Sequence, residues 1–245
     1  MAIMKKIITK LFPCICLFFS MLQADNLKDV NQQIVILLGA PGSGKGTQAV
    51  RLSKELAIPH ISTGDLFREN MSKNTPLGEK AKSFINAGKL VPDELVLEML
   101  FDRVAKPDAE KGYLLDGFPR TIPQAEALDK RLGDKVSLVV LDLEVPDDAI
   151  IKRAIGRLTC GECGKMYNTY FSAPQKENRC DVCDVELTKR ADDTLEVVQE
   201  RLKVYHSQTK PLEDYYDKKG VLHRVDGTQS PDQVYQSLLK HLNKS

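Results

Sequence analysis

The chain alternates short apolar runs with amphipathic stretches. Residues 33–38, QIVILL, form an apolar run of the kind expected for a strand buried on both faces. In residues 44–57, which follow directly, Ala49, Leu52 and Leu56 fall on one side of a helix. A strand, a glycine-rich turn and a helix in this order predict the opening of a βα unit.

The same alternation continues to the C-terminus. Further apolar runs predict strands at residues 113–115, 136–143 and 221–225. Helical periodicity predicts helices at residues 93–104, 123–132, 146–155 and 194–216, and Ser230 followed by Pro231 predicts a last helix that runs to Leu242. Alternating strands and helices favour an α/β fold with a doubly wound parallel sheet.

Two segments interrupt this rhythm. Residues 62–91 are helical in pattern and contain no predicted strand, and residues 156–193 are polar, rich in turn residues and contain four cysteines. Both segments are too long to be simple connections. We therefore expect them to be excursions from the sheet that bracket a site, as lids do.

The first 32 residues differ from the rest. Three lysines precede an apolar run at residues 11–22, and Ala24 precedes a polar stretch, which together resemble a signal peptide. The run is too short for a comfortable membrane span, and Leu22 stands where a small residue is preferred before cleavage. A start-site extension, with translation from Met21, explains the pattern equally well. In both cases residues 1–32 lie outside the predicted fold, which covers residues 33–245.

Charge gives little information about a partner. The chain has 35 basic and 34 acidic residues, a net charge of +1, with 42% hydrophobic and 28% charged residues. This composition is typical of a globular protein and gives no reason to expect nucleic acid or a membrane surface as partner. A site for anions must therefore be built locally, from cations gathered at one place.

Residues 39–47, GAPGSGKGT, predict such a local site. Gly39, Gly44 and Lys45 match the phosphate-binding loop pattern, although Gly46 stands where a serine or threonine is expected and Thr47 comes next. The glycines allow backbone N–H groups to surround phosphate oxygens, and the following helix adds positive charge at its N-terminus. Lys45 supplies a compact cation. The loop therefore predicts binding of a nucleoside phosphate.

Two Cys-x-x-Cys pairs, Cys160 with Cys163 and Cys180 with Cys183, lie in the second excursion. Such pairs present four thiolates for a tetrahedral zinc site, and four protein ligands leave no open position, so the zinc would be structural. Two disulfides remain an alternative because of the signal-like leader. A nucleic-acid-binding ribbon is a further alternative, but several acidic residues are interspersed in the segment.

A carboxylate and several arginines complete the candidate chemistry. Asp116 ends the predicted strand at residues 113–115, where parallel sheets bind ligands, and would hold magnesium through a bound water. Arg120 follows closely and would bind a phosphate. Arg153 and Arg157 are four residues apart and share a helix face. Phosphoryl transfer requires positioned cations, although any one arginine alone is more simply a surface charge.

Taken together, these motifs resemble adenylate kinase of the long-lid, zinc-bearing bacterial type. The resemblance covers the chain from Ile34 to the C-terminus, and the Gly-Lys-Gly-Thr form of the loop is usual in that family, so Gly46 fits. The motifs that carry it are GAPGSGKGT (39–47), ISTGDLFR (61–68), AGKLVPDE (87–94), YLLDGFPRTIPQAE (113–126), GRLTCGECGKMY (156–167), LTKRADD (187–193) and VDGTQ (225–229).

The resemblance implies magnesium-dependent transfer, ATP + AMP = 2 ADP, with residues 62–91 as an AMP-binding insertion and residues 156–193 as a zinc-bearing lid. It implies that ATP is bound by Gly42, Ser43, Gly44, Lys45, Gly46, Thr47, Arg157, Met166, Tyr167 and Gln229. It implies that AMP is bound by Thr63, Arg68, Lys89, Leu90, Val91, Gly117, Phe118, Pro119, Arg120, Gln124, Arg190 and Arg201.

Within these sets the resemblance assigns finer roles. Thr63 and Gln124 would contact the AMP base, and Asp192 and Asp193 would pair with the arginines of the site. Lys45, Arg120, Arg153, Arg190 and Arg201 would surround the transferred phosphoryl group. Because one chain supplies every part of this site, a monomer is the simplest expectation.

Three other functions remain open on the sequence. The first is a kinase for another nucleoside monophosphate, namely UMP, CMP or GMP. The second is a non-catalytic zinc ribbon that binds nucleic acid, and the third is a regulatory nucleotide binder. ATP, AMP and reduced cysteines favour the cytoplasm as the location, whereas a functional leader at residues 1–24 would make the protein exported.

Overall fold

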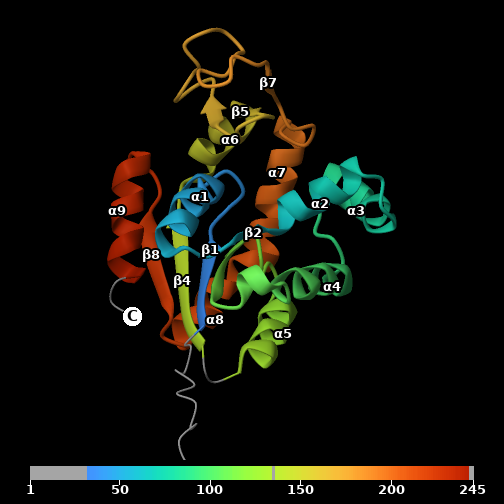
Figure 1. Cartoon of the computed structure of the whole chain (residues 1–245), viewed down its shortest axis with the longest axis vertical. Coiled ribbons are helices and arrows are strands. Elements are labelled where there is room, and N and C mark those ends of the chain that lie inside the picture. Colours follow the sequence, from blue (N-terminus) through green and yellow to red (C-terminus); the bar gives the residue numbers. More distant parts are fainter. Residues whose placement is uncertain (1–31, 134–135, 243–245) are drawn as a thin grey trace, which may run out of the picture. The chain divides into compact units, whose positions relative to one another are not determined.

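The centre of the molecule is a parallel sheet. The computed structural model describes residues 32–133 and 136–242, which fall within one contact unit. Its five strands pair in the order β2-β3-β1-β4-β8, and every pairing is parallel (Figure 1). The strands are β1 (Gln32–Leu38), β2 (His60–Ser62), β3 (Gly112–Asp116), β4 (Val136–Glu144) and β8 (Leu222–Asp226). The sheet expected from the alternating pattern is thus confirmed.

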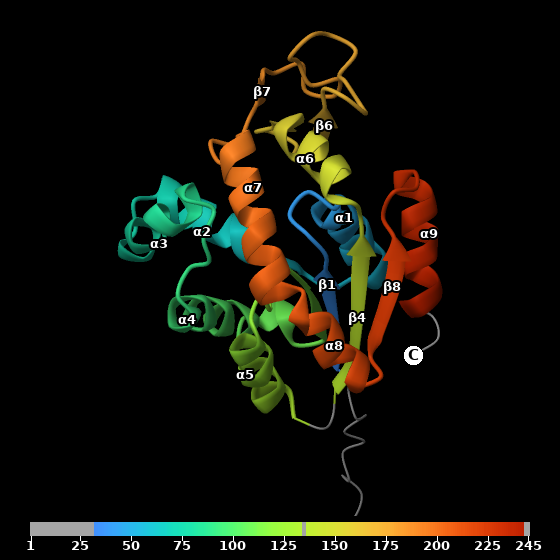
Figure 2. The ribbon, with the colours of Figure 1, turned by 180° about the vertical axis from the view of Figure 1, so that it is seen from behind.

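Helices cover both faces of this sheet (Figures 1 and 2). Ile34 and Ile36 of β1 pack with residues of α4, α5 and α8, whereas Val35 and Leu37, which point to the other face, pack with α1 and α9. This arrangement explains why β1 is apolar at every central position. The helices outside the excursions are α1 (Lys45–Leu56), α4 (Asp93–Val104), α5 (Ile122–Leu132), α6 (Asp147–Ile155), α7 (Leu195–Val204), α8 (Pro211–Lys218) and α9 (Pro231–Leu242), with a 3₁₀ turn at Pro107–Ala109.

The first excursion is a pair of helices, α2 (Thr63–Ser72) and α3 (Pro76–Asn86), beside the sheet (Figure 1). Both begin at hydroxyl caps, since Ser62 accepts a hydrogen bond from the Asp65 N–H and Thr75 accepts one from Gly78. The two helices approach closely at Gly78, where a Cβ atom would lie 2.3 Å from the Asn70 carbonyl oxygen.

The second excursion, residues 156–193, is hereafter called the ribbon. It extends beyond α6 (Figure 2). It contains a small antiparallel sheet in which the strand order is β6-β5-β7. Its strands are β5 (Arg157–Cys160), β6 (Met166–Asn168) and β7 (Leu187–Thr188). These strands are two to four residues long, and the periodicity of the sequence did not predict them.

The structure corrects one predicted helix and adds a strand that was not predicted. It also places Arg157 in β5, after α6 has ended at Ile155, so Arg157 does not share a helix face with Arg153 as expected. The single helix expected at residues 194–216 is divided, because a π-helical turn at Tyr205–Thr209 separates α7 from α8. Its Lys210 N–H donates to the Tyr205 carbonyl, and Pro211, which has no N–H, begins α8. The sequence also gave no indication of β2, whose three residues end at Ser62. The expected leader at residues 1–24 lies outside the described residues, and none of the helices described is long and apolar enough to cross a membrane.

Candidate functional site

The phosphate-binding loop lies between β1 and α1, at the carboxyl end of the central strand. Gly39 has φ of +126°, and a Cβ atom there would lie 2.7 Å from the Leu143 carbonyl oxygen, so only glycine fits. The Lys45 ammonium donates to the carbonyls of Gly39 and Ala40, at 2.6 and 2.8 Å. Burial lowers the pKa of Lys45 to about 8, which Asp116 only partly offsets. At neutral pH this cation therefore lies over the loop, where an anionic ligand would stabilise it.

Asp116 ends β3 and faces the loop, as its position after a parallel strand predicted. Its Oδ2 lies 3.6 Å from where a Cβ atom on Gly46 would stand, and 3.4 Å from His60 Nε2. Burial alone would raise the pKa of Asp116, but the His60 hydrogen bond and the Lys45 charge outweigh burial and lower it. The side chain is thus held as a carboxylate beside the loop.

Residues from α6 and the ribbon also reach the loop. Arg153 on α6 donates to the Ser43 carbonyl at 3.1 Å. Met166 of β6 also approaches the loop, with its Cε 3.9 Å from where a Cβ atom on Gly46 would stand. The glycine at this position therefore leaves room between the loop, Asp116 and the ribbon.

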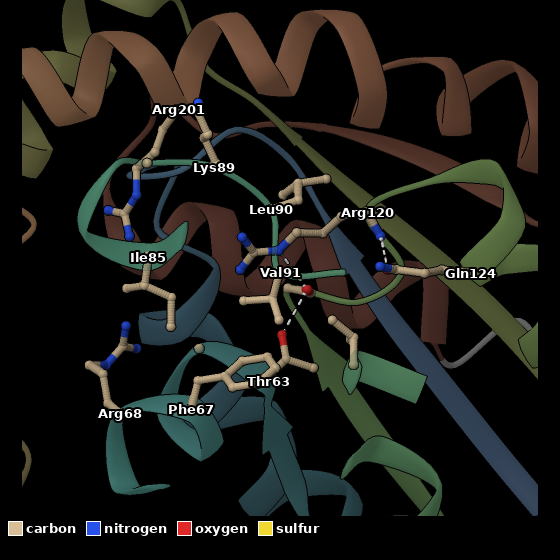
Figure 3. Close-up of a pocket in the computed structure, with 14 residues that line it drawn as sticks. Thr63, Phe67, Arg68, Ile85, Lys89, Leu90, Val91, Arg120, Gln124 and Arg201 are labelled. Carbon is tan, nitrogen blue, oxygen red and sulfur yellow. Dashed lines mark hydrogen bonds between the residues drawn. The ribbon is translucent and has the colours of Figure 1, made fainter. Parts of the chain in front are cut away.

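A second pocket opens between the sheet and the first excursion, and Figure 3 shows the side chains around it. Gly117 organises its floor, because the Thr63 hydroxyl and Arg120 Nε both donate to the Gly117 carbonyl, at 2.8 and 2.7 Å. A Cβ atom on Gly117, whose φ is +77°, would lie 2.9 Å from Arg120 Nη2. The pocket is lined by Thr63, Gly64, Phe67, Arg68, Ile85, Gly88, Lys89, Leu90, Val91, Val96, Gly117, Arg120, Gln124 and Arg201.

Partly buried guanidinium groups surround the space between loop and pocket. Burial and the neighbouring Arg201 lower the pKa of Arg120 to about 10. Burial, together with Arg157 and Arg68, lowers the pKa of Arg190 to about 10. Each group is still charged at neutral pH, but each is poorly hydrated and repelled by the others. Such a cluster is stabilised by a polyanion.

Three acids partly neutralise this cluster. Asp193, which is fully buried, accepts from Arg157 Nε and Nη2 at 2.8 and 2.5 Å, and Asp192 pairs with Arg201. Asp65 of α2 lies 2.6 Å from Arg68 and 3.8 Å from Arg190 of the ribbon. The pairing of Asp192 and Asp193 with the site arginines agrees with the sequence expectation.

The four cysteines of the ribbon lie together. Their Sγ atoms are all within 4.8 Å of one another, all four are free thiols, and Cys163 and Cys180 are 3.7 Å apart. The Tyr167 hydroxyl lowers the pKa of Cys180, whereas the contact with Cys163 raises the pKa of Cys183. The neighbouring sulfurs thus disfavour the Cys183 thiolate, and a bound dication would stabilise it.

Some of the predicted site residues lie away from the second pocket or have side chains that are already paired. Most of the predicted AMP-binding residues line the second pocket, but Arg190 lies in the ribbon, and Phe118 and Pro119 have buried side chains that do not line it. Tyr167 is also buried, and its hydroxyl accepts from the Asp181 N–H inside the ribbon. Gln229 lies in the turn after β8, where it donates to Asp226.

Several residues of the site were not identified from the sequence. Phe67, Ile85 and Val96 line the second pocket, but as apolar residues on helices they cannot be distinguished from core residues. His60 contacts Asp116 from β2, a strand that was itself not predicted. Asp93 accepts a hydrogen bond from Gln124, which is 31 residues away in the sequence. The sequence predicted only that Asp93 lies in the first turn of a helix.

Comparison with known proteins agrees with this geometry. Residues 37–221 match the family model described as Adenylate kinase. The adenylate kinase of Lachnospira eligens is 53% identical over 211 residues, which are 85% of this chain and 99% of that protein. The adenylate kinase of Carboxydothermus hydrogenoformans is 50% identical over 212 residues, 86% of this chain and 99% of that protein. That of Caldicellulosiruptor bescii is 53% identical over 211 residues, 85% of this chain and 98% of that protein. The chain belongs to the adenylate kinase family.

Proposed function

We propose that the two halves of this site catalyse ATP + AMP = 2 ADP, with ATP at the loop and AMP in the second pocket. The observation that carries the proposal is the convergence of partly buried cations from separate elements. Lys45 begins α1, Arg120 follows β3, Arg190 belongs to the ribbon and Arg201 lies on α7, and burial lowers the pKa of each. As a member of its family, the chain is a phosphotransferase.

The residues supply positioning and charge rather than a covalent participant. The nucleophile is a phosphate oxygen of AMP, which is already ionised, so no general base is needed. Lys45 and Arg153 would hold the ATP phosphates on the backbone of residues 42–47, while Arg68 and Arg120 hold the AMP phosphate. Arg190 and Arg201 would then stabilise charge on the transferred group. Holding both nucleotides in line supplies the effective concentration.

The adenine rings would lie at opposite ends of the site. Thr63 and Gln124 would contact the AMP base within the second pocket. Arg157, Met166, Tyr167 and the backbone of Gln229 would lie along the ATP base, as a set drawn from the ribbon and the turn after β8. In this proposal the excursions at residues 62–91 and 156–193 act as AMP-binding insertion and lid, and closure of the lid excludes water.

Magnesium fits the carboxylate that faces the loop. Asp116 offers hard oxygen ligands beside Gly46, and its lowered pKa keeps it ionised. Asp116 would hold the ion through bound water, together with the ATP phosphates. When bound, magnesium would neutralise charge on the phosphate oxygens.

Zinc fits the cysteine cluster of the ribbon. Four sulfurs bound to one zinc at about 2.3 Å would be separated by about 3.8 Å, close to the distance found between Cys163 and Cys180. The set of Cys160, Cys163, Cys180 and Cys183 fills all four positions of a tetrahedron, so the zinc would be structural. We further propose that the protein acts as a monomer in the cytoplasm, where ATP, AMP and reduced thiols occur together.

The test is an assay of ADP formation by the full chain with and without AMP. Lys45→Met and Arg120→Ala should each lower kcat/KM by about 10²–10³-fold, because each removes a cation from the phosphate sites. Their unfolding transitions should stay within about 1 kcal/mol of the original chain. Lys54→Met, an exposed lysine on the same helix α1, and Arg131→Ala, an exposed arginine on α5, are matched controls that should retain activity.

Two results would count against this assignment. Near-normal turnover by folded Lys45→Met or Arg120→Ala protein would show that the substituted cation is not needed for transfer. AMP would not be the acceptor if ADP formation did not depend on AMP. The same would follow if UMP, CMP or GMP supported faster transfer than AMP in a panel of monophosphates.

A further inference from the structure

A closed network of hydrogen bonds holds the side chain of Gln124 in the second pocket. Asp93, the first residue of α4, accepts from Gln124 Nε2 at 2.6 Å through Oδ1 and from the Thr121 hydroxyl at 3.0 Å through Oδ2. The Gln124 Oε1 atom accepts from the Arg120 N–H at 2.8 Å. Thr121, which caps α5, also accepts from the Gln124 N–H. The side chains of Thr121 and Gln124 are thereby tied to one carboxylate.

The network fixes which way the Gln124 amide points. If the amide were flipped, its oxygen would face the Asp93 carboxylate and its NH₂ group would face the Arg120 N–H. Both contacts would be repulsive, and Gln124 is only 1% exposed, so water cannot compensate for them. Of the two contacts, the one with Asp93 involves a full charge and is the stronger constraint.

The groups of Gln124 that remain free determine what the pocket can bind. Gln124 lines the pocket, and its network leaves one N–H on Nε2 and one acceptor position on Oε1. A 6-aminopurine offers the complement, namely a ring nitrogen that accepts beside an amino group that donates. A 6-oxopurine offers the reverse pair, a carbonyl beside a ring N–H, and requires the flipped amide.

We propose that Asp93 is the positioning residue that sets selectivity for a 6-aminopurine monophosphate over a 6-oxopurine monophosphate, by holding the Gln124 amide in one orientation. The inference rests on the proposed function, in which the acceptor base lies against Gln124. The inference goes beyond the proposed function, because it assigns the discrimination between the two purines to Asp93, a residue that does not line the pocket. A carboxylate is suited to this role because it only accepts, whereas an amide could pair with either orientation of Gln124.

Asp93 also has a simpler role, which must be separated from this one. Acidic residues in the first turn of a helix stabilise it, and Glu94 shares that turn with Asp93. Glu94 is exposed, and the structure shows no hydrogen bond of its side chain within the described residues. Glu94→Gln therefore removes a similar charge from the same helix end without touching Gln124, and serves as the matched control.

The experiment compares AMP with inosine monophosphate as acceptors for the full chain. In Asp93→Asn, the ratio of kcat/KM for AMP to that for inosine monophosphate should fall by about tenfold or more, mainly through a higher KM for AMP and a lower one for inosine monophosphate. Glu94→Gln should leave the ratio within about twofold of its original value. Asp93→Ala, which removes the carboxylate without adding a donor, should change the ratio in the same direction and serves if Asp93→Asn does not fold.

The possible results separate the two proposals. If the unmodified chain uses AMP and the folded Asp93 variants lower kcat/KM for both acceptors equally, the residue only stabilises α4 and the inference is overturned. A loss of selectivity in Glu94→Gln equal to that in Asp93→Asn would overturn it as well. If the unmodified chain does not use AMP at all, the proposed function itself fails, and the role of Asp93 fails with it.

Discussion

The central sheet and the ribbon differ in what fills their interiors. The sheet has apolar clusters on both faces, built from strands and from helices that are distant in sequence. The buried cluster of the ribbon consists of Cys160, Tyr167, Cys180 and Leu187, so half of its members are proposed zinc ligands. The ribbon also exposes Tyr170, Phe171 and Val182 to solvent, which a segment with a core of its own would bury.

This difference bears on how each part can move. A sheet held by burial on both faces can change only by losing many contacts at once. With zinc bound as proposed, the four sulfurs would make the ribbon rigid internally, and its chain joins the rest of the molecule at residues 156 and 193. Those ends are joined by Arg157, the first residue of β5, and Asp193, the residue before the α7 cap. In the proposed function the ribbon would therefore move as one body, as a lid requires.

The largest expected effect comes from removing one thiol. Cys163→Ser leaves three proposed zinc ligands, and because zinc sites in small domains contribute several kcal/mol or more to folding, the ribbon should lose its order. Hydrogen exchange should then become fast in the ribbon while β1 stays protected, and transfer activity should fall by about tenfold or more through loss of Arg190 from the site. Native mass spectrometry should show one zinc lost.

A control and two contrary outcomes define this test. Val182→Ser changes an exposed residue between two of the cysteines and should leave exchange and zinc content unchanged. Unchanged protection of the ribbon in Cys163→Ser would show that a metal is not what stabilises it. For the unmodified chain, a mass that lacks four hydrogens and contains no metal would indicate two disulfides instead of a zinc site.

The next effect concerns the link between the ends of the ribbon. Asp193→Asn leaves Arg157 and Arg201 without the buried carboxylate that they share, at 2.5 and 3.7 Å. Removing one partner of a buried ion pair costs about 3–5 kcal/mol, so urea unfolding should detect a loss of this size at low nucleotide concentration. Saturating ATP should reduce the loss, because its phosphates would also neutralise the arginines.

Asp184→Asn is the matched control within the ribbon. Asp184 is exposed and pairs with Lys176 and Arg179, so its removal should cost at most about 1 kcal/mol. If Asp193→Asn proved as mild as this control, the ends of the ribbon would have to be held together by other contacts.

The sheet and the ribbon also differ in how far their sequences predicted them. The β1 run, the glycine loop and α1 could be predicted because their signals are local, and the predicted helix at residues 93–104 agrees with α4 at both ends. The division between α7 and α8 was missed, because the apolar spacing continues through a π-helical turn. The strands of the ribbon were missed because their order depends on the cysteine cluster rather than on apolar alternation.

For the site, spacing alone indicated the phosphate loop and the four cysteines. Arg120 was indicated by its place just after the strand that ends at Asp116, whereas the other arginines had no individual signal and were assigned through resemblance to a family. Contacts between distant segments, such as Asp65 with Arg190 or Asp93 with Gln124, could not be predicted at all, because nothing local in the sequence records which donor each carboxylate will meet.

The smallest expected effect is a change in the stability of the central sheet. It concerns Asp142, a buried residue of β4. Asp142 is 1% exposed, and neither of its carboxyl oxygens has a hydrogen-bond partner within the described residues. Burial, with the nearby charges of Glu213 and Glu144, raises its pKa from 3.8 to about 7. Between these two pH values the unfolded chain releases the proton while the folded chain keeps it, so stability falls as pH rises through this window and levels off above pH 7.

Asp142→Asn removes this ionisation, and urea unfolding at several pH values measures the result. The variant should be more stable than the original chain by about 1–4 kcal/mol at pH 8, with a difference that shrinks steadily toward pH 4. Asp148→Asn, an exposed acid in the first turn of α6, should shift stability by about 0.5 kcal/mol or less at every pH. A gain in Asp142→Asn that did not vary with pH would mean that the carboxyl is hydrated or paired in solution. The sheet would then tolerate a charge in its interior, and the contrast with the ribbon, where charges and thiolates replace an apolar core, would be weaker than the structure indicates.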